Sequence, residues 1–183
     1  MSTPLTEFLE TSNHTIDEII AEVKRITGIE FPRDHPLYGF YQMPASTKFH
    51  GCFKGGLAIH SLRVFWCALK LAPAFGMTYD EVDANACIFH DLVKVDAYTY
   101  NTFAQSFTYN YNAVGLPHGS ESLRRMYKYN IPISSEAWEL AVAYHMGAFE
   151  PDSAQAYSKA CEKHKAVLLL HTADMMATKL YNQ

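Results

Sequence analysis

The chain has 183 residues, 49% of them hydrophobic and 19% charged, with a formal net charge of −4. This composition suits one domain with a hydrophobic core and excludes broad electrostatic binding to nucleic acid. The four cysteines form no CxxC pair, which argues against a zinc ribbon or a thioredoxin-type site. We expect a cytoplasmic protein without membrane contact, because the sequence shows neither an apolar run of about 20 residues nor a signal-peptide pattern.

The N-terminal part is predicted to be helical. Residues 1–14 favour a short helix, and Asn13 or Thr15 is a candidate N-cap for a second helix that ends at Gly28. Residues 1–30 would then form an N-terminal helical extension. From residue 31 to 53, prolines and glycines favour an aromatic and basic loop, which would either line a substrate mouth or only connect two helices.

An apolar helix is predicted next. Gly55–Gly56 opens it, it ends near Leu71, and His60 lies one turn inside it. Apolar side chains on most of its sides indicate a central position in the fold. Taken alone, His60 would more often be a hydrogen-bonded core histidine than a metal ligand.

The following predicted helix begins at Thr78 and ends in the sequence His90–Asp91, with Lys94 close behind. Helical spacing would put residues 87, 90, 91 and 94 on one face. The apolar neighbours of this segment indicate burial, and a buried Asp or Lys without a partner costs several kcal/mol. A divalent metal ion would compensate these groups, since imidazole and carboxylate are both ligands of first-row metals.

The rest of the chain is predicted to contain a small β-hairpin and further helices. Strand-forming segments at 98–100 and 107–111 place the hairpin near 97–112. Helices are predicted from His118 to Tyr129, from Ser134 or Ser135 to Gly147, over about 151–162 and over about 163–181. The sequence therefore predicts an all-α helical bundle with a β-hairpin insertion, in a single domain over residues 1–183 whose metal-binding core spans 45–180.

Histidines and aspartates in apolar settings recur on separate predicted helices. The candidate metal ligands are His60, His90, Asp91, His118, His145 and Asp174. Converging helices of a bundle can direct such side chains inward. One or two divalent transition-metal ions would satisfy this set, and mixed His and carboxylate ligation admits Mn, Fe, Co, Ni or Zn.

The order of these candidates, with Lys94 three residues after the dipeptide His90–Asp91, resembles that of HD-domain metal-dependent phosphohydrolases. Residues 49–62 and 168–174 are similar to the HD module of bacterial 3′-to-5′ exoribonucleases and to small stand-alone HD proteins of bacteria and phages. The resemblance therefore implies that the predicted helical bundle is an HD domain.

Two further segments resemble the binuclear, six-ligand branch of this family. Residues 117–119 and 144–147 each supply one of its two additional histidines. The sequence departs from the family at Val93, where glycine is common, and it leaves no room for the oligonucleotide-binding domain of the exoribonucleases.

The resemblance implies a division of the six ligands between two ions. The first ion would be held by His60, His90, Asp91 and Asp174, and Asp91 would bridge to a second ion held by His118 and His145. A metal-activated hydroxide would then cleave a phosphate ester or anhydride, in a nucleotide or a short single-stranded oligonucleotide. Asp91 and Lys94 are the predicted catalytic residues, with Lys94 offsetting charge on the phosphate oxygens.

Several other residues are weaker candidates for substrate contact. His50, Lys54 and Glu121 are such candidates beside Lys94, and Glu121 could also orient His118 from one turn away. A solvated surface position is the alternative for His50, Lys54 and Glu121. His171 could support Asp174, or could be a core histidine.

Three other functions are compatible with the same residues. An HD-type mixed-valent di-iron oxygenase that acts on a small organic substrate would use the same six ligands. A non-enzymatic binding or regulatory domain could retain the ions for a structural role. A mononuclear enzyme could use His118 and His145 as acid, base or phosphate-binding groups.

Overall fold

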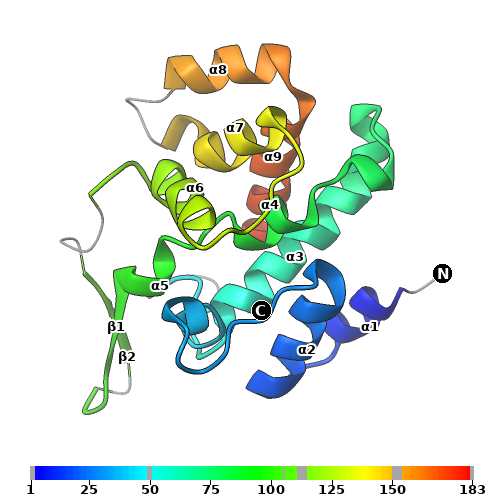
Figure 1. The fold of residues 1–183 in the computed structure, drawn as a ribbon. Helices are drawn as coiled ribbons and strands as arrows, with labels where there is room; N and C mark the ends of the chain where they lie inside the picture. Colours follow the sequence, from blue (N-terminus) through cyan, green and yellow to red (C-terminus); the bar gives the residue numbers. More distant parts are fainter. Residues whose placement is uncertain (1–2, 49–50, 105, 111–114, 150–153, 182–183) are drawn as a thin grey trace.

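The computed structural model of the protein describes residues 3–48, 51–104, 106–110, 115–149 and 154–181. Within these ranges helices dominate, and a two-stranded antiparallel sheet lies beside them (Figure 1). The structure confirms the predicted all-α class with a small β-hairpin. The α-helices are α1 (Pro4–Glu10), α2 (Ile16–Thr27), α3 (Gly56–Leu71), α4 (Ala84–Phe89), α5 (Lys94–Ala97), α6 (His118–Lys128), α7 (Glu136–Tyr144), α8 (Ala154–Lys163) and α9 (Lys165–Lys179). Short 3₁₀ helices are η1 (Pro36–Tyr41), η2 (Ala72–Phe75), η3 (Tyr79–Glu81) and η5 (Gly147–Phe149).

The centre of the fold is formed by α3, α7 and α9. Helix α3 packs along α9, α9 packs on α7, and α7 packs on α6. Fully buried aliphatic side chains fill these contacts, among them Leu62 on α3, Val142 on α7 and Leu170 on α9. Burial of such side chains contributes about 1.5–3 kcal/mol each relative to exposure. The packing therefore fixes the relative positions of the helices that carry the candidate ligands.

Helix α2 begins and ends where the sequence predicts. The Glu18 N–H donates to Thr15 Oγ1 at 3.2 Å, and the Thr15 N–H donates to the Glu18 carboxylate at 2.7 Å. This reciprocal capping box satisfies two donors at the helix start that would otherwise have no partner. Gly28 ends the helix in the left-handed region, with φ +73°.

The segment that leads to His90 is not the single helix predicted from Thr78. Thr78 caps the short η3 instead, and Val82 then leaves the helical conformation. Asp83 starts α4, because its Oδ1 accepts the Ala86 N–H at 2.9 Å, while its Oδ2 accepts the Ser134 N–H at 2.6 Å. The Asp83 carboxylate therefore caps α4 and also binds the segment before α7, and these two hydrogen bonds favour a new helix start at this position over a continuous helix.

The residues after α4 form a turn rather than a continuation of the helix. Residues 90–93 lie in this turn, and α5 begins at Lys94. The turn is held by α6, since the buried Val93 N–H donates to Ser122 Oγ at 3.1 Å and Arg125 donates to the Leu92 carbonyl at 3.3 Å. The prediction that residues 87, 90, 91 and 94 share the face of one continuous helix is therefore wrong, because i-to-i+3 turn hydrogen bonds and contacts with α6 take the place of the helical ones.

The β-hairpin projects away from the helical body (Figure 1). Strand β1 (Tyr98–Asn101) pairs with β2 (Ser106–Tyr109), with Tyr98 opposite Tyr109 and Asn101 opposite Ser106. At the base of the hairpin, Tyr98 is buried and its hydroxyl donates to the Ala45 carbonyl at 3.4 Å. This contact ties the hairpin to the segment before α3. Among the described residues, none of the helices combines the length and the apolar character that a membrane crossing requires.

Candidate metal centre

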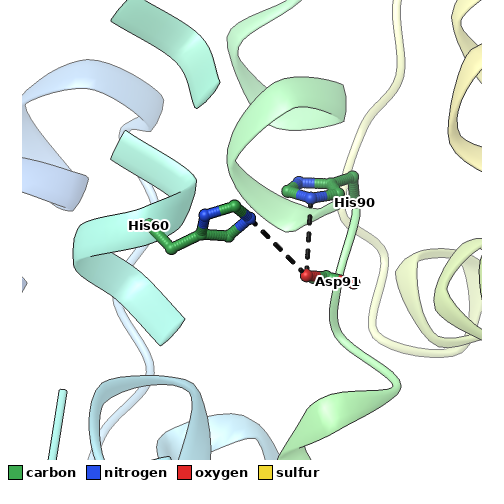
Figure 2. A group of neighbouring side chains, drawn as sticks. All are labelled: His60, His90 and Asp91. Atoms are coloured by element: carbon green, nitrogen blue, oxygen red, sulfur yellow. Dashed lines mark ion pairs between the residues drawn. The ribbon is translucent and has the colours of Figure 1, made fainter. Parts of the chain in front are cut away.

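The six candidate ligands predicted from the sequence meet in the interior of the bundle. They come from α3, the turn after α4, the start of α6, the end of α7 and the middle of α9. Figure 2 shows His60 reaching from α3 toward the Asp91 carboxylate, with His90 directing its ring to the same carboxylate. Residues more than 100 positions apart in the sequence thus face one point.

One group of donor atoms surrounds Asp91 Oδ2 and Asp174 Oδ1. The Nε2 atoms of His60 and His90 lie 3.8 and 3.5 Å from Asp91 Oδ2. The same two nitrogen atoms lie 3.1 and 3.9 Å from Asp174 Oδ1. His60, His90 and Asp91 offer donor atoms that all lie within 4.8 Å of one another, which is a spacing that one metal ion can bridge.

A second group surrounds the other oxygen of the same carboxylate. Asp91 Oδ1 lies 2.5 Å from His118 Nε2 and 3.5 Å from His145 Nε2. These three residues also offer donor atoms within 4.8 Å of one another. The two oxygens of Asp91 thus face different histidine pairs, and a third group of donor atoms, from His90, His145 and Asp174, overlaps both groups.

The hydrogen bonds of two histidines fit a metal in this centre. His90 Nδ1 lies 2.8 Å from the Cys87 carbonyl, and His145 Nδ1 lies 2.8 Å from the Val142 carbonyl. A carbonyl only accepts, so Nδ1 carries a proton in each ring, and in the neutral form of each ring Nε2 has the lone pair. Both Nε2 atoms are buried and have no hydrogen-bond partner among the described residues.

Each of these Nε2 atoms faces an acceptor. Asp91 Oδ2 is 3.5 Å from His90 Nε2, and Asp91 Oδ1 is 3.5 Å from His145 Nε2. A buried lone pair against a carboxylate oxygen is unfavourable unless a proton or a metal cation lies between the two atoms. The residues present therefore fit a divalent ion bound by imidazole and carboxylate.

The charge states of the carboxylates and of His90 are those of metal ligands. Burial lowers the pKa of His90 to about 4, so the ring is neutral near pH 7. Burial alone would raise the pKa of the Asp91 carboxyl, but Lys94 and the surrounding histidines hold it well below its usual range. Burial also opposes ionisation of Asp174, yet His60 keeps its pKa low. Ligands in these states need not lose a proton before they bind a metal ion.

The two histidines of the second group respond differently to burial. Burial lowers the pKa of His118. It also opposes protonation of His145, but the Asp91 carboxylate, whose Oδ1 is 3.5 Å from Nε2, outweighs it and raises that pKa. A divalent ion would compete with this proton for His145 Nε2.

Lys94 adds a positive charge at the wall of the centre. Its Nζ lies 2.6 Å from Asp91 Oδ2, and only 14% of its side chain is exposed. Burial opposes the charged form of Lys94, but the Asp91 carboxylate outweighs it and raises the pKa, so the side chain is an ammonium.

A cleft of about 350 Å³ opens onto the candidate centre between the end of α7, η5 and α9. Asp91, Lys94, His145 and Asp174 form its inner end. The other lining residues are Met146, Phe149, His171, Met175, Thr178 and Lys179. A second cleft, of about 290 Å³ near α1, contains none of the six candidate ligands. The first of these two clefts is therefore the one that reaches the candidate centre.

The weaker substrate-binding candidates lie away from this cleft or outside the described residues. His50 is not among the described residues. Lys54 is exposed and lines a different cleft, beside α1. Glu121 is buried, against the alternative of a solvated position, and its carboxylate accepts from Arg124 at 2.7 and 2.8 Å and from Arg125 at 2.9 Å. Substrate contact by these three residues stays a prediction.

Other residues at the site carry no distinctive sequence pattern. His171 Nδ1 lies 2.7 Å from the His145 carbonyl and donates to it, rather than to Asp174. Gly147 makes room for this contact. It has φ +58° and no Cβ, and a Cβ at this position would lie only 2.7 Å from the His171 ring. The glycine that ends the α7 region was the available signal, although only the tertiary structure shows which ring packs against it.

Comparisons with known proteins give one weak similarity. The chain is 28% identical over 124 residues to the dihydroneopterin 2′,3′-cyclic phosphate phosphodiesterase of Methanocaldococcus jannaschii. The match covers 63% of this chain and 48% of that enzyme, so the chain spans about half the length of the curated relative it matches. No family model matches the sequence, and no solved structure matches it. The chain is thus similar to an enzyme named as a phosphodiesterase and contains buried His and Asp groups that can hold a metal ion.

Proposed function

We propose that this protein is a metal-dependent phosphohydrolase of the HD superfamily that cleaves phosphate esters of nucleotides or short oligonucleotides. The observation that carries the proposal is the Asp91 carboxylate, whose two oxygens face two different histidine pairs in a buried centre. The similarity to a named cyclic-phosphate phosphodiesterase supports a phosphodiester as the substrate.

The proposed ligand assignment follows the two groups of donor atoms. His60, His90, Asp91 and Asp174 would hold one ion, and Asp91, His118 and His145 would hold the other. When bound, such ions supply Lewis-acid activation of water and of the phosphate. The Cys87 and Val142 carbonyls keep the His90 and His145 rings in the required tautomer.

The chain's own charges complete the proposed phosphate site. The Lys94 ammonium lies at the cleft wall, where it can donate to a non-bridging phosphate oxygen. Its contact with Asp91 also positions the carboxylate. Because Lys94 is largely buried, its charge is less screened by water than that of a surface lysine.

The cleft favours an organic group with an apolar face next to the phosphate. Met146 and Met175 line it, and Phe149 at its edge is 66% exposed. Thioether and aromatic side chains make favourable contacts with flat rings. A nucleobase would match this surface, as would the pterin in the name of the similar phosphodiesterase.

The proposal is tested by hydrolysis of a substrate panel under controlled metal loading. Metal-stripped protein would receive Mn, Fe, Co, Ni, Zn or Mg, and would be assayed with 2′,3′-cyclic nucleotides, dinucleotides and short single strands. The variants are Asp91→Asn, which removes the bridging carboxylate, and Asp80→Asn, an exposed matched control.

We expect metal-dependent product release by the wild type and by Asp80→Asn, with at least a 100-fold loss of kcat in Asp91→Asn. Equal activity of the Asp91→Asn variant would contradict the assignment. Oxygen consumption by ferrous protein, without cleavage of any phosphate ester, would replace the hydrolase with the oxygenase alternative.

A further inference from the structure

Two cationic side chains line the cleft at the candidate centre. Lys94 lies at the inner end, beside Asp91, and Lys179 lies on the last turn of α9. The side chains of Met146 and Met175 line the wall of the same cleft. A ligand that is complementary to this cleft has two separated anionic groups and an apolar portion.

Lys179 lines the cleft because it lies on the same face of α9 as the other lining residues of that helix. Residues 171, 174, 175, 178 and 179 all line the cleft, and their helical spacing makes one continuous stripe on α9. At about 1.5 Å of rise per residue, Lys179 lies about 7.5 Å further along the axis than Asp174. Its flexible side chain adds reach, so it can contact a group beyond the phosphate at the centre.

The charge of Lys179 is available to a ligand. The side chain is exposed, and among the described residues no carboxylate lies within ion-pair distance of its ammonium. Lys94 differs, since its ammonium is already bonded to Asp91 at 2.6 Å. The two cations are therefore suited to different tasks, one at the reacting phosphate and one at a distant anion.

We infer that Lys179 binds a second phosphate of the substrate and so selects nucleotides that carry two phosphate groups. The inference rests on the proposed function and narrows its substrate class. The preferred substrates would be short oligonucleotides or nucleotides phosphorylated at both the 3′ and the 5′ side, rather than nucleotides with one phosphate. Phosphate contact by an ammonium requires only a point charge, which lysine supplies.

The test measures binding, so that it does not depend on turnover. Adenosine 3′,5′-bisphosphate and adenosine 3′-phosphate would be titrated into metal-loaded protein by calorimetry at fixed ionic strength. The variants are Lys179→Ala, Lys179→Arg, which retains the charge, and Lys159→Ala on α8 as an exposed control.

We expect the wild type to bind the bisphosphate about 10-fold more tightly than the monophosphate, a difference of about 1.4 kcal/mol. Lys179→Ala should abolish this preference, whereas Lys179→Arg and Lys159→Ala should keep it. Equal affinity of the wild type for both ligands, no binding of either, or an unchanged preference in Lys179→Ala would each overturn the inference.

The hydrolysis panel separates this inference from the proposed function. Turnover of singly phosphorylated cyclic nucleotides that persists in Lys179→Ala would leave the phosphohydrolase in place even if the bisphosphate preference were absent. Loss of all phosphoester cleavage would instead contradict the proposed function itself.

Discussion

At the scale of single residues, the candidate centre depends on how each ligand is oriented rather than on ligand type alone. His90 and His145 each donate from Nδ1 to a carbonyl three residues earlier, so both present Nε2 to Asp91. Asp91 is ionised and shared, with one oxygen toward each histidine pair. Removing ligands from one side of Asp91 should therefore affect one ion position and spare the other.

We predict that His118→Ala lowers the bound divalent metal from two ions per chain to one. His118 lies on the Oδ1 side of Asp91, where its Nε2 is 2.5 Å from the oxygen. The measurement is elemental analysis of dialysed protein, with His164→Ala, at the start of α9, as the control. An unchanged content of two ions in His118→Ala would show that this histidine is not a ligand.

The ionisation of Glu121, on α6, makes the stability of the protein depend on pH. The hydrogen bonds from Arg124 and Arg125 hold its pKa below the ordinary value of 4.5. The folded state then binds this proton less readily than the unfolded state does, so stability is present above about pH 4.5 and is lost as the pH falls toward the lower folded pKa.

We expect Glu121→Gln to be less sensitive than the wild type to acid below pH 4.5. Glutamine has no carboxyl group to protonate, so the variant lacks this pH-dependent contribution to the free energy of unfolding. Urea unfolding at a series of pH values measures the effect, with the exposed Glu136→Gln as the control. Parallel pH curves for the wild type and Glu121→Gln would contradict the prediction.

At the scale of elements, α6 and α7 approach each other closely next to two candidate ligands. A Cβ at Gly119 would lie 2.3 Å from the Ala143 carbonyl oxygen, so only glycine fits there. Gly119 follows His118 on α6, and Ala143 precedes His145 by two residues. The same helix holds the His90–Asp91 turn through Ser122 and Arg125. Helix α6 thus both carries His118 and fixes the turn that carries His90 and Asp91.

We predict that Gly119→Ala destabilises the protein by about 1–3 kcal/mol, because an added methyl group forces two backbones apart. The separation should also move His118 away from Asp91 and weaken binding of the second ion. Urea unfolding and metal titration measure the two effects. Gly115→Ala is the matched control, since a Cβ there meets no atom within 4 Å. Equal stability and equal metal content in both variants would argue against the close approach.

At the scale of the whole molecule, the proposed ions would link elements that are distant in the sequence. The candidate ligands lie on α3, the turn after α4, α6, α7 and α9, and α3 and α9 also pack against each other. An unfolded chain does not hold these side chains together. Metal binding would therefore favour the folded state, by an amount that grows with metal concentration.

We expect Mn²⁺ or Zn²⁺ at about 100 times its Kd to raise Tm by about 5–10 °C. Such binding contributes about 2.7 kcal/mol, and 1 kcal/mol corresponds to about 2–4 °C for a domain of this size. Differential scanning calorimetry with metal and with chelator measures the shift, and Asp91→Asn serves as the variant with an impaired centre. A Tm that is independent of metal would contradict a centre of this kind.

The sequence by itself determined the helical class, the hairpin and the identity of the side chains that meet at the centre. These features are local or strongly patterned: apolar periodicity marks α3 and α9, an N-cap residue and a terminal glycine mark α2, and alternating aromatics mark the hairpin. His60 and Asp174 stood out because polar groups in apolar faces require partners.

Only the tertiary structure decided how these parts are used. The turn at residues 90–93 is held by Ser122 and Arg125, which supply hydrogen bonds from 29 and 33 residues later, and no local pattern records these contacts. The same holds for the buried position of Glu121 and for the place of Lys179 on the wall of the cleft. Periodicity assigns a residue to a helix face, but packing between distant segments determines what that face meets.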